Sequence, residues 1–110
     1  MPTAPRPLLL YYVKGLHCVV CEKNGPELHK WLEKRQSAKY DASVPMITLI
    51  ETFATDAGGK PGPVGRTGWS PRATPGWALS SLDGELIAHN EGYMSAVEIE
   101  RWVRRAGGER

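Results

Sequence analysis

One apolar segment close to the start of the chain constrains the fold most. Residues 8–13, Leu-Leu-Leu-Tyr-Tyr-Val, are apolar along their whole length, follow several prolines and end just before Lys14 and Gly15. A strand without polar alternation is buried on both faces, as the inner strands of α/β sheets are. The segment therefore predicts a central strand with neighbours on both of its faces.

A helix and a second strand follow this segment. Residues 22–39 contain helix formers with an apolar stripe at helical spacing, made of Leu28, Trp31 and Leu32. Pro26 lacks a backbone N–H and should kink the helix or mark the start of its second part. Residues 44–53 are apolar and rich in β-branched side chains, which indicates a strand. The order strand, helix, strand predicts a right-handed crossover and a parallel pair.

The second half of the chain opens with a long loop and a hairpin. From about residue 57 to residue 73 the sequence is rich in glycine and proline, and a loop of this length is either mobile or functional. Residues 77–82 and 85–90 flank Asp83-Gly84, a pair favoured in tight turns, so two antiparallel strands are expected.

A capping box predicts the closing helix. Ser95 is followed three residues later by Glu98, and an apolar stripe continues at Ile99, Trp102, Val103 and Ala106. Glycines 107 and 108 end the helix. The whole order, βαβ, loop and ββα, predicts an α/β fold in which helices pack on a mixed four-stranded sheet. We expect one domain over residues 8–107, preceded by a flexible segment at 1–7.

Composition fits such a domain and excludes several kinds of partner. The chain has 110 residues, of which 41% are hydrophobic and 24% charged, as is common for a single globular domain. The net charge of +2 comes without a concentrated basic stripe, so no nucleic-acid partner is expected. No apolar run approaches the roughly 20 residues that cross a bilayer, so no membrane span is expected. We expect a monomer.

The two cysteines, Cys18 and Cys21, are separated by two residues and lie between the first strand and the first helix. A disulfide closing so short a loop removes little entropy from the unfolded chain, so stabilisation alone explains the spacing poorly. Backbone N–H groups at a helix start stabilise a thiolate and lower a cysteine pKa from about 8.5 into the range of about 3.5 to 7.5. The pattern predicts a redox pair in which Cys18 is the nucleophile and Cys21 the buried resolving thiol.

Two other roles for the cysteines stay open. A zinc site needs about four ligands, and besides the thiols the sequence offers His17, His29 and His89 at no zinc-finger spacing, so no metal is expected. The alternative is a pair of inert cysteines in a domain that only binds.

Several landmarks together resemble the thioredoxin superfamily. They are Cys18-Val19-Val20-Cys21 after the central strand, Pro26 five residues beyond the second cysteine, Thr74-Pro75, Asp83-Gly84, and Gly92 followed by Ser95 before the last helix. The resemblance implies a thioredoxin-like fold and a cis peptide bond at Thr74-Pro75 that faces the disulfide and offers backbone groups to an extended substrate. It also implies chemistry that requires no organic cofactor.

The departures from that superfamily are equally specific. His17 replaces the usual aromatic residue before the motif, Val-Val replaces Gly-Pro inside it, and Tyr12 stands where thioredoxins have a buried aspartate. The N-terminal strand and helix of full thioredoxins are missing, which leaves something nearer to a glutaredoxin-type core. The motif also lacks the tyrosine of glutaredoxins, which argues against glutathione use.

Two further residues are candidates for substrate binding. His17, when protonated, could stabilise the neighbouring thiolate, or it could be an exposed loop residue. Trp69 lies in the long loop and could grip an extended polypeptide, whereas Trp77 is better explained as a core residue of the third strand.

The sequence thus predicts a protein-disulfide oxidoreductase that acts on protein disulfides or dithiols and exchanges electrons with an upstream redox partner. The alternative is a thioredoxin-fold binding or assembly module of an envelope complex with a non-catalytic cysteine pair, and a metallochaperone that uses the thiols with His17 is a third reading. The proline-rich opening resembles a tether, and Thr74 resembles the residue found before the cis-proline of periplasmic disulfide isomerases. We therefore expect an exported, periplasmic bacterial protein that serves cell redox homeostasis, with a cytoplasmic location as the alternative.

Overall fold

The described part of the chain folds into a mixed sheet with two helices. The computed structural model describes residues 7–15, 18–37, 46–53 and 64–107. Its elements are β1 (Leu8–Lys14), α1 (Val19–Ser37), β2 (Ile47–Phe53), β3 (Gly76–Ser81), β4 (Leu86–Glu91) and α2 (Ala96–Gly107). The sheet order is β2-β1-β3-β4, with β1 parallel to β2 and antiparallel to β3. The expected α/β fold with a mixed four-stranded sheet is confirmed.

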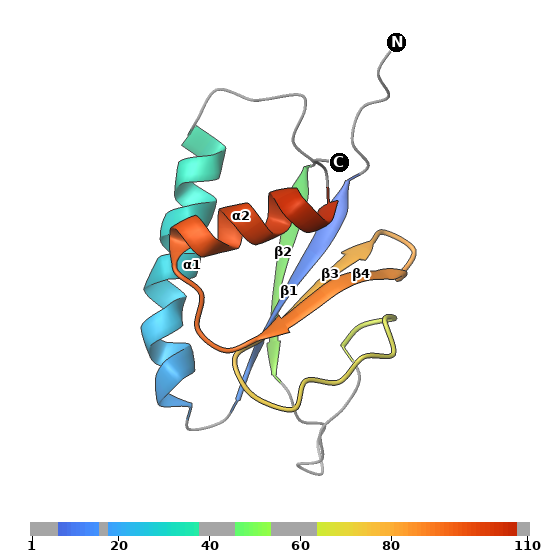
Figure 1. Cartoon of the computed structure of the whole chain (residues 1–110), viewed down its shortest axis with the longest axis horizontal. Helices are drawn as coiled ribbons and strands as arrows, with labels where there is room; N and C mark the ends of the chain where they lie inside the picture. Colours follow the sequence, from blue (N-terminus) through green and yellow to red (C-terminus); the bar gives the residue numbers. More distant parts are fainter. Residues whose placement is uncertain (1–6, 16–17, 38–45, 54–63, 108–110) are drawn as a thin grey trace.

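Both helices cover the same face of the sheet (Figure 1). That face holds the larger core cluster, in which β1, β3 and the two helices meet. Its buried members are Leu8, Leu10, Tyr12, Leu28, Trp31, Trp77, Leu79, Met94, Ile99 and Val103. Alternate residues of β1 point to the opposite face, as the pleat of a strand requires. There Tyr11, Val13 and Ala78 pack against Val64.

The first helix starts earlier than the sequence indicated. It begins at Val19, not at residue 22, so Cys21 lies within its first turn and Pro26 lies inside it. The other boundaries differ by smaller amounts. β2 begins at Ile47 within the described residues, and Leu82 belongs to the hairpin turn and not to β3.

The hairpin turn has three residues, Leu82, Asp83 and Gly84, where a tight Asp-Gly turn was expected. The Gly84 N–H donates to the Ser81 carbonyl at 3.1 Å, and the Ser81 N–H donates to the Glu85 carbonyl at 2.9 Å. Gly84 has a φ of +99°, which glycine adopts at the lowest cost. Three-residue hairpin loops commonly end in such a glycine.

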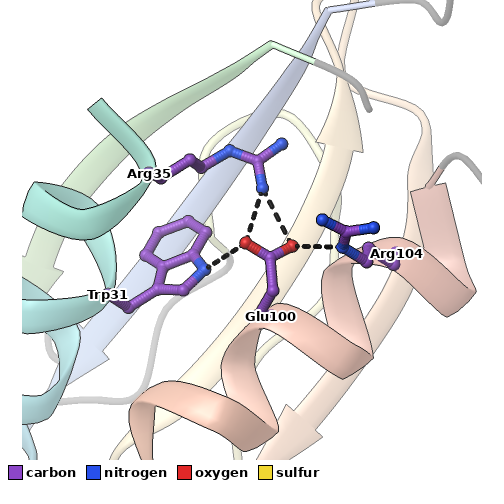
Figure 2. Close-up of polar contacts among 4 residues, drawn as sticks. All are labelled: Trp31, Arg35, Glu100 and Arg104. Carbon is purple, nitrogen blue, oxygen red and sulfur yellow. Dashed lines mark hydrogen bonds and ion pairs between the residues drawn. The ribbon is translucent and has the colours of Figure 1, made fainter. Parts of the chain in front are cut away.

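A carboxylate joins the two helices (Figure 2). Glu100 of α2 accepts hydrogen bonds from Trp31 Nε1 at 3.2 Å, from Arg35 Nη1 at 2.9 and 3.0 Å, and from Arg104 Nε at 3.0 Å. Nearer the start of α2, the Ala96 N–H donates to Glu27 Oε1 of α1 at 3.1 Å. These contacts fix α2 across α1 (Figure 1). Neither helix, over the residues described, is long and apolar enough to cross a membrane.

Candidate redox site

The two cysteines form a disulfide at the start of α1. Their Cα atoms are 5.2 Å apart. Cys18 directly precedes the helix and is partly exposed, whereas Cys21 lies in the first turn and is only 5% exposed. One sulfur is therefore accessible and the other is covered, which is the asymmetry expected of an attacking and a resolving thiol.

Two hydrogen-bond donors converge on the accessible sulfur. The Cys21 backbone N–H points at Cys18 Sγ across 3.1 Å, and the Thr74 hydroxyl points at it across 3.3 Å. Hydrogen bonds to a charged form favour that form. In the reduced protein these donors, together with the partial positive charge of the helix N-terminus, would stabilise a Cys18 thiolate.

Thr74 reaches the disulfide from the segment that leads into β3. The Thr74–Pro75 peptide bond is cis, and Pro75 is buried. On its other side Thr74 lies against the end of β1, where a Cβ added to Gly15 would be only 2.6 Å from Thr74 Oγ1. The absence of a side chain at Gly15 thus leaves room for Thr74 next to Cys18.

Tyr12 contacts the first turn of α1 from β1. Its ring is buried against Trp77, with ring centroids 4.7 Å apart, and its hydroxyl donates to the Cys21 carbonyl at 2.9 Å. Burial, helped by the negative charge of Glu51, raises the pKa of Tyr12 to about 12. The hydroxyl is therefore neutral at physiological pH, and it anchors the backbone of Cys21 without carrying charge.

Sequence reasoning missed Asn24, which joins α1 to the segment before α2. Asn24 is fully buried on α1; its Nδ2 donates to the Met94 carbonyl and its Oδ1 accepts from the Met94 N–H, both at 2.8 Å. The pair fixes the segment before α2, including the half-exposed Tyr93, against the helix that carries the cysteines. The available signal was that Asn24, a polar residue, lies at helical spacing from the apolar Leu28 and Trp31.

The remaining candidate residues lie in different places. Trp69 stacks on His89, with ring centroids 5.0 Å apart, and lines a hollow of about 370 Å³ together with Ser70, Arg72, His89 and Glu91.

Trp77 is fully buried, as expected of a core residue. His17 lies outside the described residues. Inside the motif, Val19 and Val20 are 62% and 44% exposed and give the disulfide an apolar border.

The part of the chain that is described offers no cluster of metal ligands. Within those residues no three His, Cys, Asp or Glu side chains lie close enough together to hold an ion. The cysteine sulfurs are bonded to each other. A disulfide with one accessible sulfur can undergo thiol–disulfide exchange.

Comparison with solved structures identifies the fold. The crystal structure of StoA from Bacillus subtilis superposes with a TM-score of 0.57 at 12% sequence identity, covering 92% of this chain and 84% of that one. No protein-family model matches the sequence, and no curated protein matches it by sequence. The fold is thioredoxin-like. A likeness at this identity speaks for the fold alone.

Proposed function

We propose that this chain is a thiol–disulfide oxidoreductase that exchanges disulfides with protein substrates through Cys18 and Cys21. The observation that carries the proposal is the convergence of two donors, the Cys21 N–H and the Thr74 hydroxyl, on the partly exposed sulfur of Cys18. The Cys21 N–H would meet the sulfur in a helix cap as well, but the Thr74 hydroxyl comes from a distant segment, and a purely structural disulfide has no need of this second donor. Donors of this kind stabilise a nucleophilic thiolate.

In the reducing direction the Cys18 thiolate attacks one sulfur of a substrate disulfide. An S–S bond forms between Cys18 and the substrate, and the second substrate sulfur leaves as a thiolate that takes up a proton. Cys21, having lost its proton, then attacks Cys18 Sγ. The Cys18–Cys21 disulfide forms, the first substrate sulfur leaves as a thiolate and is protonated, and two electrons have passed from the protein to the substrate.

The same steps run in reverse when the Cys18–Cys21 disulfide oxidises a substrate dithiol. An upstream redox partner restores the starting state by the same exchange chemistry. The exposed valines of the motif and the backbone around Thr74 are the surfaces that a polypeptide would meet beside Cys18. No further cofactor is needed, because both electrons reside in the cysteine pair.

The test is a pair of matched substitutions. Cys18→Ser should abolish the reduction of insulin disulfides and the refolding of a scrambled substrate. Cys21→Ser should accumulate a mixed disulfide between Cys18 and the substrate, visible on a non-reducing gel and reversed by dithiothreitol. A wild-type protein without turnover, whose Cys18 ionises near the ordinary pKa of about 8.5, would contradict the proposal and favour a binding module with an inert cysteine pair.

A further inference from the structure

We propose that Glu91 is a positioning residue: its carboxylate holds the segment 72–75 so that the Thr74 hydroxyl lies against Cys18 Sγ. The inference rests on the proposed function, because it assigns a residue that tunes the same redox pair. Glu91 ends β4 and is far from the cysteines in sequence. It was not among the residues that the sequence pointed to.

One carboxylate oxygen of Glu91 accepts hydrogen bonds from two consecutive backbone N–H groups. Oε2 lies 2.6 Å from the Arg72 nitrogen and 2.7 Å from the Ala73 nitrogen. Hydrogen bonds to an ionised acceptor are shorter and roughly twice as strong as neutral ones. The two residues held in this way directly precede Thr74, so the carboxylate fixes the chain immediately before the group that touches the sulfur.

The chain is held on the other side of Thr74 as well. The Gly92 N–H donates to the Pro75 carbonyl at 2.8 Å, and Gly76 pairs with Glu91 in the sheet. A Cβ added at Gly76 would be 2.6 Å from Pro71 Cβ, so the segment packs closely over the start of β3. Thr74 thus sits between a backbone anchor that follows it and a side-chain anchor that precedes it.

Only the side-chain anchor can be removed by substitution without changing the backbone. When Glu91 is lost, the Arg72 and Ala73 N–H groups turn to water and the segment before Thr74 gains freedom. A hydrogen bond weakens steeply as its length and angle depart from the optimum, and the 3.3 Å contact from Thr74 Oγ1 to Cys18 Sγ depends on where this segment places the hydroxyl. The reduced Cys18 thiolate should therefore lose part of its stabilisation.

The experiment compares the reduced wild-type chain with Glu91→Ala, Glu91→Gln and Thr74→Val. Glu91→Ala removes the acceptor and the charge, whereas Glu91→Gln keeps an acceptor oxygen. Thr74→Val removes the hydroxyl that the inference places downstream. The control is Glu85→Ala, which removes the same charge from an exposed position at the other end of the hairpin. Cys18 ionisation is followed by thiolate absorbance at 240 nm against pH, and reactivity by the rate of alkylation with iodoacetamide at pH 7.

We expect Glu91→Ala to raise the pKa of Cys18 and to slow alkylation about three- to tenfold, the scale of one net hydrogen bond. Thr74→Val should do the same, Glu91→Gln should fall between Glu91→Ala and wild type, and Glu85→Ala should match wild type. Combining Glu91→Ala with Thr74→Val should add little to Thr74→Val alone, because both act through one hydroxyl.

Two results would overturn the inference. One is a Glu91→Ala protein with a lowered unfolding midpoint and an unchanged Cys18 titration, which would make Glu91 a structural residue only. The other is full additivity in the double variant. If Glu91→Ala does not fold, Glu91→Gln carries the same comparison. A wild-type chain without turnover whose Cys18 titration still responds to Glu91 would refute the proposed function and leave the positioning role standing.

Discussion

The Tyr12 hydroxyl lies next to the backbone of Cys21 and is uncharged at neutral pH. Its pKa is raised from 10.0 to about 12 because burial disfavours the phenolate, and the negative charge of Glu51 adds to the effect. At neutral pH it therefore acts as a neutral hydrogen-bond donor to the Cys21 carbonyl. A group with this pKa keeps its proton near pH 7, so Tyr12 is not a base that could take the proton of Cys21.

This predicts how stability depends on pH. Between pH 10 and about 12 the unfolded chain loses the Tyr12 proton while the folded chain keeps it, so the folded state binds more protons and stability falls as pH rises. The contribution is fully present below pH 10 and is lost as pH rises through about 12. Urea unfolding of wild type and Tyr12→Phe between pH 8 and pH 12 measures it.

Wild type should lose more stability than Tyr12→Phe across that window. Below pH 10, Tyr12→Phe should be less stable by about 0.5 to 1.5 kcal/mol, because one buried hydrogen bond is lost. Absorbance at 295 nm provides an independent check, since wild type should show a tyrosine that ionises near pH 12 and Tyr12→Phe should lack it. Parallel stability curves for the two proteins above pH 10 would rule out this role for Tyr12.

Among the elements, α1 carries the cysteines and α2 holds α1 in place. Asn24, Glu27, Trp31 and Arg35 all project from one side of α1 toward α2 or the turn before it. Glu100 is the centre of this contact, with donors on both helices (Figure 2). The orientation of the disulfide on the sheet therefore depends on polar contacts as well as on the apolar stripe.

Replacing Glu100 with alanine should lower the free energy of unfolding by about 1 to 2 kcal/mol, less than a fully buried charged hydrogen bond because the group is partly exposed to solvent. Glu33→Ala, at an exposed position on α1, is the matched control and should change stability by no more than about 0.5 kcal/mol. Urea unfolding followed by circular dichroism gives both values. Equal losses in the two variants would show that the contact between the helices contributes nothing specific.

The starts of the two helices show what local sequence can and cannot predict. At α2 the capping box is confirmed: the Glu98 N–H donates to Ser95 Oγ and the Ser95 N–H donates to Glu98 Oε1, both at 3.2 Å. At α1 no oxygen-bearing cap precedes the two valines, which are weak helix formers. The sulfur of Cys18 accepts the Cys21 N–H in place of a cap, so the start was assigned three residues too late.

The residues of the candidate site also fall into those that the sequence could predict and those that it could not. Cys18, Cys21 and Thr74 could be selected because their spacing and their neighbours in sequence carry the pattern, and the structure brings the three into contact. Asn24 and Glu91 could not, because each binds backbone groups of a distant segment. Backbone partners leave no trace in residue identity, so only the register of β3 with β4 and the packing of α1 reveal them.

At the scale of the whole molecule the two faces of the sheet are covered by different kinds of structure. The helices cover one face, and the irregular segment 64–75 packs over part of the other. Near the end of this segment, the Thr74 hydroxyl contacts Cys18 Sγ. Val64 is 3% exposed and lies beside Tyr11, Val13 and Ala78. The contacts of Val64 with these three residues thus hold the segment that leads to Thr74 against the sheet.

Because an irregular segment has few backbone hydrogen bonds of its own, it should open more readily than the helices. Val64→Ala removes two buried methyl groups from its support and should cost about 1 to 3 kcal/mol. We expect hydrogen exchange, measured by mass spectrometry, to accelerate most in peptides covering 64–75. In α1 and α2 it should change only by the loss of global stability. Uniform acceleration over the whole chain would mean that both faces unfold as one unit, and that the segment holding Thr74 has no independent motion through which the redox pair could be tuned.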